Sequence, residues 1–442
     1  MPSTPTSSER PEIADRRDDQ PTLYRDRSFW AMTATQFLGA FNDNLFKQLV
    51  LLLSAGGVGA VIVGQKPPDR QGEAMVIFAL PFLLFSGVAG YLSERLSKTH
   101  IVVAAKVAEI LVMCLGVVAF VFYRSFGLTG AFMVLGLMGM QSAFFGPSKY
   151  GILPEMLRER DLPRANGFFL MTTFVAIILG TAVAGFLKGT NINYLWIPTT
   201  VCIAIAVVGT CTALLVRYIP AARADLEFEK STLAIPPDIR ALLARDRTLL
   251  GAVVLSCLFW LLGGLVLLGV NALGLRQLLI GAKLAGILAA CMSVGIAAGC
   301  LLAGKLCHGR ADFRLVRFGA WMMVVCLFLL GMPAIGAIGN AAGTHLLGFY
   351  GSIPVLIALG MAAGMFAVPL QVVIQTHPPQ GQKGRMIAAL NICTWLSILI
   401  SGVLYGGAAK AIAATELPEA SVFFFAILFI LPVALLCRTN QS

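Results

Sequence analysis

The sequence predicts an all-α membrane protein with twelve transmembrane helices in two six-helix bundles. Three observations predict it: an apolar composition, twelve apolar segments of helix length, and basic residues that gather in alternate loops. Of the 442 residues, 58% are hydrophobic and only 12% are charged, whereas a soluble domain carries about 25% charged residues. A chain this apolar cannot hide its surface from water by folding, so it needs lipid as its solvent.

The apolar segments have the length of membrane-spanning helices. A helix needs about 20 apolar residues to cross the hydrocarbon core, whereas a barrel strand needs about 10 residues in strict alternation. The segments are long and do not alternate, so we expect helices. The predicted spans are 28–54, 73–93, 101–123, 128–147, 165–187, 194–217, 247–272, 284–304, 314–338, 348–376, 386–409 and 418–437.

Lysines and arginines gather on one side of this topology. With a cytoplasmic N-terminus, 24 of them fall inside, 7 fall outside, and Lys47 and Lys106 lie within spans. Cytoplasmic loops of membrane proteins carry such an excess. The net charge of +11 therefore indicates membrane orientation and not nucleic-acid binding. Residues 1–27 are polar and lack the order of a signal peptide, so we expect a disordered cytoplasmic tail.

The chain divides into two halves at a charged central connection. Residues 218–246, which include three prolines, separate six spans within 28–217 from six within 247–437. A weak repeat supports the division. Gly90-x-Leu92 and a basic turn close span 2, and Gly304-x-Leu306 and a basic turn close span 8. Two parallel repeats related by an axis along the membrane normal are one architecture of secondary transporters.

Charged and amide side chains inside two spans are the candidate substrate site. Ionisable groups in a membrane helix are costly unless they are paired or face a cavity. Asp43 and Lys47 are four residues apart, and Lys106 and Glu109 are three apart, so each pair shares a helix face. These groups form structural ion pairs, or they line the transport cavity, or both; either Lys47 or Lys106 could pair with Asp43. The predicted substrate-binding residues are Asn42, Asp43, Asn44, Lys47, Lys106 and Glu109.

The loop after span 2 is the candidate gate. Residues 90–98 read GYLSERLSK, and this string resembles the loop 2–3 signature of the major facilitator superfamily, with glutamate in place of the commoner aspartate. We expect Gly90 to let span 2 end against a neighbouring helix. Glu94 and Arg95, followed by Lys98, can form ion pairs across the cytoplasmic seam that break when the seam opens. The alternative is an ordinary basic cytoplasmic loop.

Three further motifs carry a more specific resemblance. They are QFLxAFNDN at 36–44, FxPxKYGILPE at 145–155 and ANG at 165–167. Together they resemble the bacterial lysophospholipid transporter (LplT) family, a branch of the major facilitator superfamily, although the second half matches only in architecture. In the second motif we expect Pro147 and Gly151 to end the helix, and Pro154 to begin a short new one with Glu155 in its first turn.

The resemblance implies a function. It implies a major facilitator fold that flips lysophospholipids, such as lysophosphatidylethanolamine, to the inner leaflet of the cytoplasmic membrane for reacylation. It also implies Asp43 as the acid of the site and a separate acyltransferase as a partner. We expect a monomer. The competing hypotheses are a proton-coupled transporter of a small molecule, such as a drug or a sugar, and a non-transporting membrane scaffold.

Other chemistry finds no motif in the chain. The ten cysteines stand singly in apolar stretches, without a Cys/His cluster at metal-ligand spacing. There is no Walker loop for ATP. None of the four histidines is followed by an aspartate at the His-x4-Asp spacing of fused acyltransferase domains. We therefore expect no metal, no cofactor and no enzymatic activity.

The charge distribution gives a testable topology. In a variant without the ten native cysteines, Lys230→Cys should react with a membrane-impermeant maleimide only when the cytoplasmic side is exposed. Lys410→Cys, in a predicted outer loop, is the matched control and should react in intact cells. Labelling of residue 230 from outside alone would overturn the predicted topology.

Overall fold

Helices form the regular structure throughout the described residues. The structure, a computed structural model, describes residues 22–56, 68–158, 161–187, 194–222, 224–225, 237–306, 312–333, 345–379 and 383–436. No strand occurs in these ranges. The central part of the predicted linker, 226–236, and the first 21 residues of the predicted tail lie outside them.

Twelve long helices match the twelve predicted spans. In the first half they are α2 (Arg27–Ser54), α3 (Gln71–Arg95), α4 (Lys98–Val121), α5 (Tyr123–Gly151), α7 (Leu162–Leu187) and α8 (Trp196–Leu214). In the second half they are α10 (Arg247–Ala272), α11 (Gly281–Leu306), α12 (Phe313–Gly331), α13 (Gly348–Thr376), α14 (Lys383–Ala414) and α15 (Ser421–Leu436). The predicted fold class is confirmed. Nine helices of the described part are long and apolar enough to cross a membrane.

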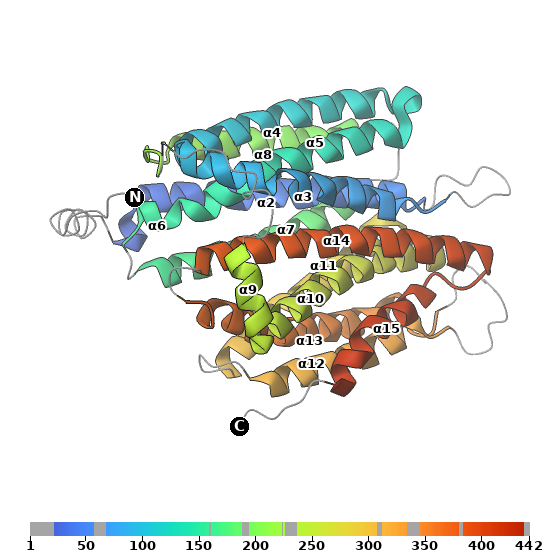
Figure 1. Cartoon of the computed structure of the whole chain (residues 1–442). Coiled ribbons are helices and arrows are strands. Elements are labelled where there is room, and N and C mark those ends of the chain that lie inside the picture. Colours follow the sequence, from blue (N-terminus) through green and yellow to red (C-terminus); the bar gives the residue numbers. More distant parts are fainter. Residues whose placement is uncertain are drawn as a thin grey trace.

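Four short elements join the long helices. They are the 3-10 turn η1 (Leu23–Arg25), α6 (Leu153–Met156), α9 (Pro237–Arg245) and the π-helical turn η5 (Leu273–Gln277). In Figure 1, α2 to α8 form the upper part of the molecule and α10 to α15 the lower part. We call the end that holds α6, α9 and the start of α2 the linker end; the other is the opposite end.

The first helix of each half begins at an aspartate. The side chain of Asp26 accepts hydrogen bonds from the backbone N–H groups of Ser28 and Phe29, at 2.8 and 3.2 Å. Asp246 accepts one from the N–H of Leu249 at 2.9 Å, at the start of α10. A helix leaves its first N–H groups without partners, and aspartate at this position satisfies them. The caps fix where α2 and α10 enter the bundle.

Two predicted helix ends differ from the structure. The expectation that Pro147 ends the helix is wrong, but the helix does end at Gly151 as predicted. It continues through Pro147 because a proline removes one helical hydrogen bond and neighbouring helices support the rest. Pro154 and Glu155 do begin the short α6. At the other place, α12 ends at Gly331 instead of 338, since the residue before Pro333 disfavours helical backbone.

Glycines let the two halves touch at the opposite end. A Cβ atom on Gly72 of α3 would lie 2.5 Å from the carbonyl oxygen of Gly402 in α14. A Cβ atom on Gly185 of α7 would lie 3.0 Å from the Cα atom of Gly286 in α11. Small residues at such crossings bring helix backbones into contact. The crossings therefore hold α3 against α14 and α7 against α11.

Burial along α2 and α10 also shows that the two halves are in contact at the opposite end. On α2, side chains such as Phe37, Asp43 and Lys47 are partly exposed, but residues 48–52 are all buried. On α10 many residues before 265 are partly or fully exposed, whereas residues 268–277, in the last turn of α10 and in η5, are all buried. The two halves are therefore packed together at the opposite end.

Candidate functional site

A buried ion pair joins α4 to α2. Lys106 Nζ lies 2.5 Å from Glu109 Oε2, and Asn42 Nδ2 donates a 2.6 Å hydrogen bond to Glu109 Oε1. The two charged side chains are 0% and 1% exposed. Lys106 fits because two neighbours are glycines: Cβ atoms on Gly39 and Gly209 would lie 2.9 and 3.0 Å from its Nζ and Cε atoms.

Asp43 faces a different helix. The Ser142 hydroxyl of α5 donates a 2.6 Å hydrogen bond to Asp43 Oδ2, and Gln141 beside it donates to the Ala105 carbonyl at 3.1 Å. Within the described residues, Asp43 has no ion pair, so neither Lys47 nor Lys106 is the partner that the sequence suggested. As a residue, Asp43 is partly exposed, in contrast to the buried Asn42 beside it.

Lys47 and Asn44 form a second accessible pair. Lys47 Nζ donates a 2.9 Å hydrogen bond to Asn44 Oδ1 and lies 5.1 Å from the centre of the Phe78 ring of α3. Both side chains are partly exposed. Among the described residues, Lys47 therefore has no ion pair, because its partners there are an amide oxygen and an aromatic face.

The geometry of a helix explains why the six predicted substrate-binding residues fall into two groups. Successive residues of a helix point about 100° apart, so Asn42 turns to α4 while Asp43 turns to α5. The structure therefore divides the six residues into two groups. Asn42, Lys106 and Glu109 are buried and hold helices together, whereas Asp43, Asn44 and Lys47 are accessible. An acid, an amide and a base on neighbouring faces of one helix suit a ligand that carries both charges.

The sequence did not identify Ser142, Gln141 or Phe78 as site residues. Two adjacent polar residues in an otherwise apolar span 4 were the available signal for Ser142 and Gln141. Nothing in the pattern singled out Phe78. In the ANG motif, Ala165 is buried, and the side chain of Asn166 lies outside the described residues.

The predicted gating residues lie at the linker end. Arg95 is exposed, donates to the Tyr91 hydroxyl and lies 5.7 Å from the centre of that ring. Lys98 Nζ lies 2.5 Å from Glu155 Oε1 of α6, with the lysine side chain 6% exposed. This ion pair is within the first half and does not cross the seam between halves. Glu94 is partly exposed.

The expected role of Gly90 is wrong. A Cβ atom on Gly90 would meet no atom within 4 Å, so the glycine is not needed for close contact with a neighbouring helix. In the same loop region, Gly151 does have a close contact: its Cβ atom would lie 2.9 Å from Lys98 Cε. The glycine that makes room for the charged loop is therefore Gly151.

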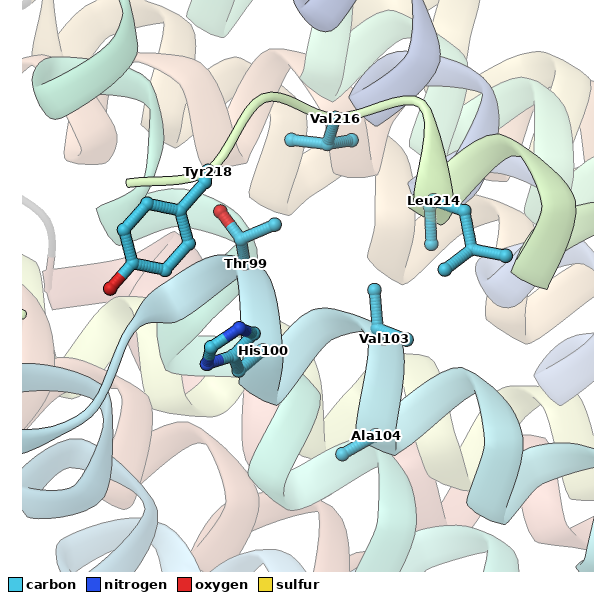
Figure 2. A pocket seen from close by; sticks show the side chains of 8 residues that line it. Thr99, His100, Val103, Ala104, Leu214, Val216 and Tyr218 are labelled. Atoms are coloured by element: carbon cyan, nitrogen blue, oxygen red, sulfur yellow. The ribbon is translucent and has the colours of Figure 1, made fainter. Parts of the chain in front are cut away.

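A surface hollow lies elsewhere, between α4 and the end of α8. Figure 2 shows His100 and Tyr218 at one side of it and Val103 and Leu214 at another. Its volume is about 360 Å³, and the His100 and Tyr218 ring centroids are 5.3 Å apart. None of the six predicted substrate-binding residues lines this hollow, so it is separate from the candidate site.

The fold and the polar groups of its first helix define a secondary transporter that spans the membrane several times. The chain belongs to the Major Facilitator Superfamily, whose sequence profile matches residues 65–402.

Similar proteins are known at the level of sequence and of fold. A protein of Photorhabdus laumondii named lysophospholipid transporter LplT is 26% identical over 397 residues, covering 87% of this chain and 89% of its own. A protein of the same name from Salmonella heidelberg is 28% identical over 404 residues, covering 85% and 86%. The structure of a POT family transporter in complex with 5-aminolevulinic acid superposes with a TM-score of 0.71 at 11% identity, covering 95% and 97%.

The buried ion pair gives a thermodynamic prediction. Lys106→Met should lower the free energy of unfolding by about 3–5 kcal/mol, because it leaves Glu109 charged and unpaired in an apolar interior. Glu109→Gln should be costly for the same reason. The double variant should recover much of the loss. Thermal unfolding of the purified proteins in detergent measures all three, and fully additive losses would show that the two side chains do not act as a pair.

Proposed function

We propose that the chain flips lysophospholipids across the cytoplasmic membrane by alternating access, for reacylation inside. The relatives named lysophospholipid transporter support the substrate class, because they match this chain over most of its length. The observation that carries the proposal is Asp43: a partly exposed aspartate midway along α2, whose carboxylate accepts from Ser142 and has no ion pair in the described part of the chain.

The site matches the head group of such a lipid. Lysophosphatidylethanolamine carries an ammonium and a phosphate, and both lose water when they enter the bundle. Asp43 is placed to accept the ammonium, since its only described partner is the Ser142 hydroxyl. Lys47, one helical turn away, has no ion pair within the described residues and is placed to meet the phosphate, with Asn44 as its hydrogen-bond partner. An ionised group inside a membrane is costly unless it is paired. The pairs of Asp43 with the ammonium and of Lys47 with the phosphate would meet this requirement.

The charge pattern supports an orientation of the chain in the membrane. We place the protein in the bacterial cytoplasmic membrane with the linker end and both termini in the cytoplasm. The 24 basic residues assigned to that side support this orientation. A lipid delivered there would be reacylated by a separate acyltransferase. Membership of a transporter superfamily supports a chain that is not itself an enzyme, and we infer that it acts as a monomer.

Glu94, Arg95 and Lys98 are proposed to act in gating at this end. Arg95 is exposed, and the hydrogen bond described for it is to Tyr91 of its own helix, so it can change partners as the seam moves. Lys98 is fixed to α6 and therefore anchors the loop to the first half. The residues stand at the edge of the bundle, distant along the chain from Asp43 on α2, which supports a role in rate and not in substrate affinity.

Asp43→Asn should abolish lysolipid transport in protein that remains folded. Asparagine keeps the shape and an acceptor for Ser142 but removes the charge that pairs with the ammonium. Proteoliposomes containing fluorescent lysophosphatidylethanolamine measure the rate, which should fall at least 10-fold. Asp312→Asn is the matched control, because asparagine caps a helix as well as aspartate, and α12 begins at Asp312. Wild-type flipping by folded Asp43→Asn protein would remove Asp43 from the site.

The gating proposal makes a different prediction. Arg95→Ala should slow lysolipid transport several-fold while the equilibrium Kd for the lysolipid stays within twofold. Arg240→Ala, an exposed base on α9 at the same end, is the control and should change neither. A large loss of affinity at an unchanged rate contradicts gating.

A further inference from the structure

Three buried amide side chains connect the two halves at the opposite end. Gln48 Nε2 of α2 donates to Asn271 Oδ1 of α10 at 2.8 Å. Asn271 Nδ2 in turn donates to Gln71 Oε1 of α3 at 2.9 Å. Gln71 and Asn271 are 0% exposed and Gln48 is 1% exposed. Asn271 is therefore a bridge from the second half to two helices of the first.

A tyrosine makes a second connection beside the first. The Tyr405 hydroxyl of α14 donates a 2.6 Å hydrogen bond to Asp69 Oδ2, just before α3. Gln71 Nε2 contacts the same Asp69 oxygen at 3.1 Å and the Tyr405 oxygen at 3.2 Å. Tyr405 is 2% exposed. Gln71 thus belongs to both connections and links them into one network.

The π-helical turn at the end of α10 supplies a third connection. A π turn closes i to i+5 hydrogen bonds, as Leu273 O and Leu278 N do here at 2.8 Å. Residues five apart in such a turn lie near one face, so Arg276 and Asn271 both face α2. Arg276 Nη1 donates to the Ala55 carbonyl at 3.0 Å, at the C-terminal end of α2, where a helix attracts positive charge. Arg276 also forms an ion pair with Glu419, in which Arg276 Nε lies 2.8 Å from Glu419 Oε1.

Backbone contacts enclose this network. The Gly72–Gly402 crossing joins α3 to α14, and the Gly185–Gly286 crossing joins α7 to α11. Close crossings leave little room for water. A buried amide or hydroxyl without a partner is destabilising, and a buried carboxylate without one is more so. Each of these groups finds a partner in the other half, so separating the halves exposes all of them at once.

We infer that Gln48, Asp69, Gln71, Asn271, Arg276 and Tyr405 form a polar latch that keeps the opposite end closed and makes the closed state the resting state. The latch rests on alternating access as proposed above. Its groups can separate when water replaces their partners, whereas lipid tails cannot do so. The latch therefore opens toward an aqueous phase. One acceptor, Gln48 Oε1, is buried without a partner within the described residues, so the latch is less than fully satisfied when closed.

Asn271→Leu in the full-length protein tests the latch. Leucine has a similar size, removes the bridge and leaves Gln48 Nε2 and Gln71 Oε1 without their described bonds. Spin labels at Val121 and Leu417, exposed residues of the two halves, report the separation of the opposite ends by double electron–electron resonance. Wild-type protein should give mainly the short distance. In Asn271→Leu the fraction at a longer distance should rise at least threefold.

Two further variants make the test decisive. Tyr405→Phe removes one hydroxyl and should shift the distances in the same direction by less, and it serves as the test if Asn271→Leu does not fold. Gln36→Leu is the matched control: Gln36 is also 0% exposed, but its amide contacts α7 within the first half, through Phe169 O and Thr173 Oγ1. It should lower thermal stability and leave the distances unchanged.

The outcomes separate the latch from the proposed function. Unchanged distances in folded Asn271→Leu and Tyr405→Phe overturn the latch, whatever the transport result. A shift in distance equal to that caused by Gln36→Leu also overturns it, because general loosening would then explain the effect. A clear shift in a protein that flips no lysolipid leaves the latch standing and overturns the substrate alone.

Discussion

The need to give every polar group in a dehydrated bundle a partner governs the arrangement of this protein. Lys106 is the clearest case. Its ammonium is fully buried, and it lies there because Glu109 supplies an opposite charge and two glycines leave space. Asn42 completes the set by occupying the second carboxylate oxygen of Glu109. Removal of any one member leaves an unpaired group, which is far costlier than loss of the whole set.

The same constraint identifies what is free to act. Once the buried groups have partners, Asp43 and Lys47 remain partly exposed on α2, and no ion pair joins them within the described residues. A transporter needs such groups, because a substrate that loses its water must gain a compensating charge inside. The polar segment of α2 therefore has two tasks. Asn42 contributes to stability, and its neighbour Asp43 remains available to a ligand.

The sequence predicted the helices far better than the side-chain partners. The hydrocarbon thickness sets a length, so apolar segments such as 247–272 and 348–376 coincide with α10 and α13. Helix caps such as Asp246 follow local rules. Partners across the bundle depend on how helices rotate, and no local pattern reports rotation. The sequence could place Asp43 opposite Lys47 or Lys106, but it could not show that Ser142 of α5 is the group that meets it.

Distance along the chain explains a second difference. Asn271 is an amide within an apolar segment of the second half, but its partners Gln48 and Gln71 are about two hundred residues away in the sequence. The pairing needs the twist of the π turn and two glycine crossings, none of which a pattern of apolar residues specifies. For Gly90 the sequence suggested a contact that the structure does not have. A glycine in a familiar string suggested close packing, yet its surroundings are open.

The position of α2 links the site to the latch. Lys47 and Gln48 are adjacent in sequence, and they point about 100° apart, toward the accessible face and toward Asn271 respectively. A substrate that draws Lys47 toward its phosphate exerts force on the helix that carries one arm of the latch. Gln48 donates one hydrogen bond to Asn271, and its side-chain oxygen has no partner within the described residues. Movement of α2 therefore changes the contact between Gln48 and Asn271 in the same step as it changes the site.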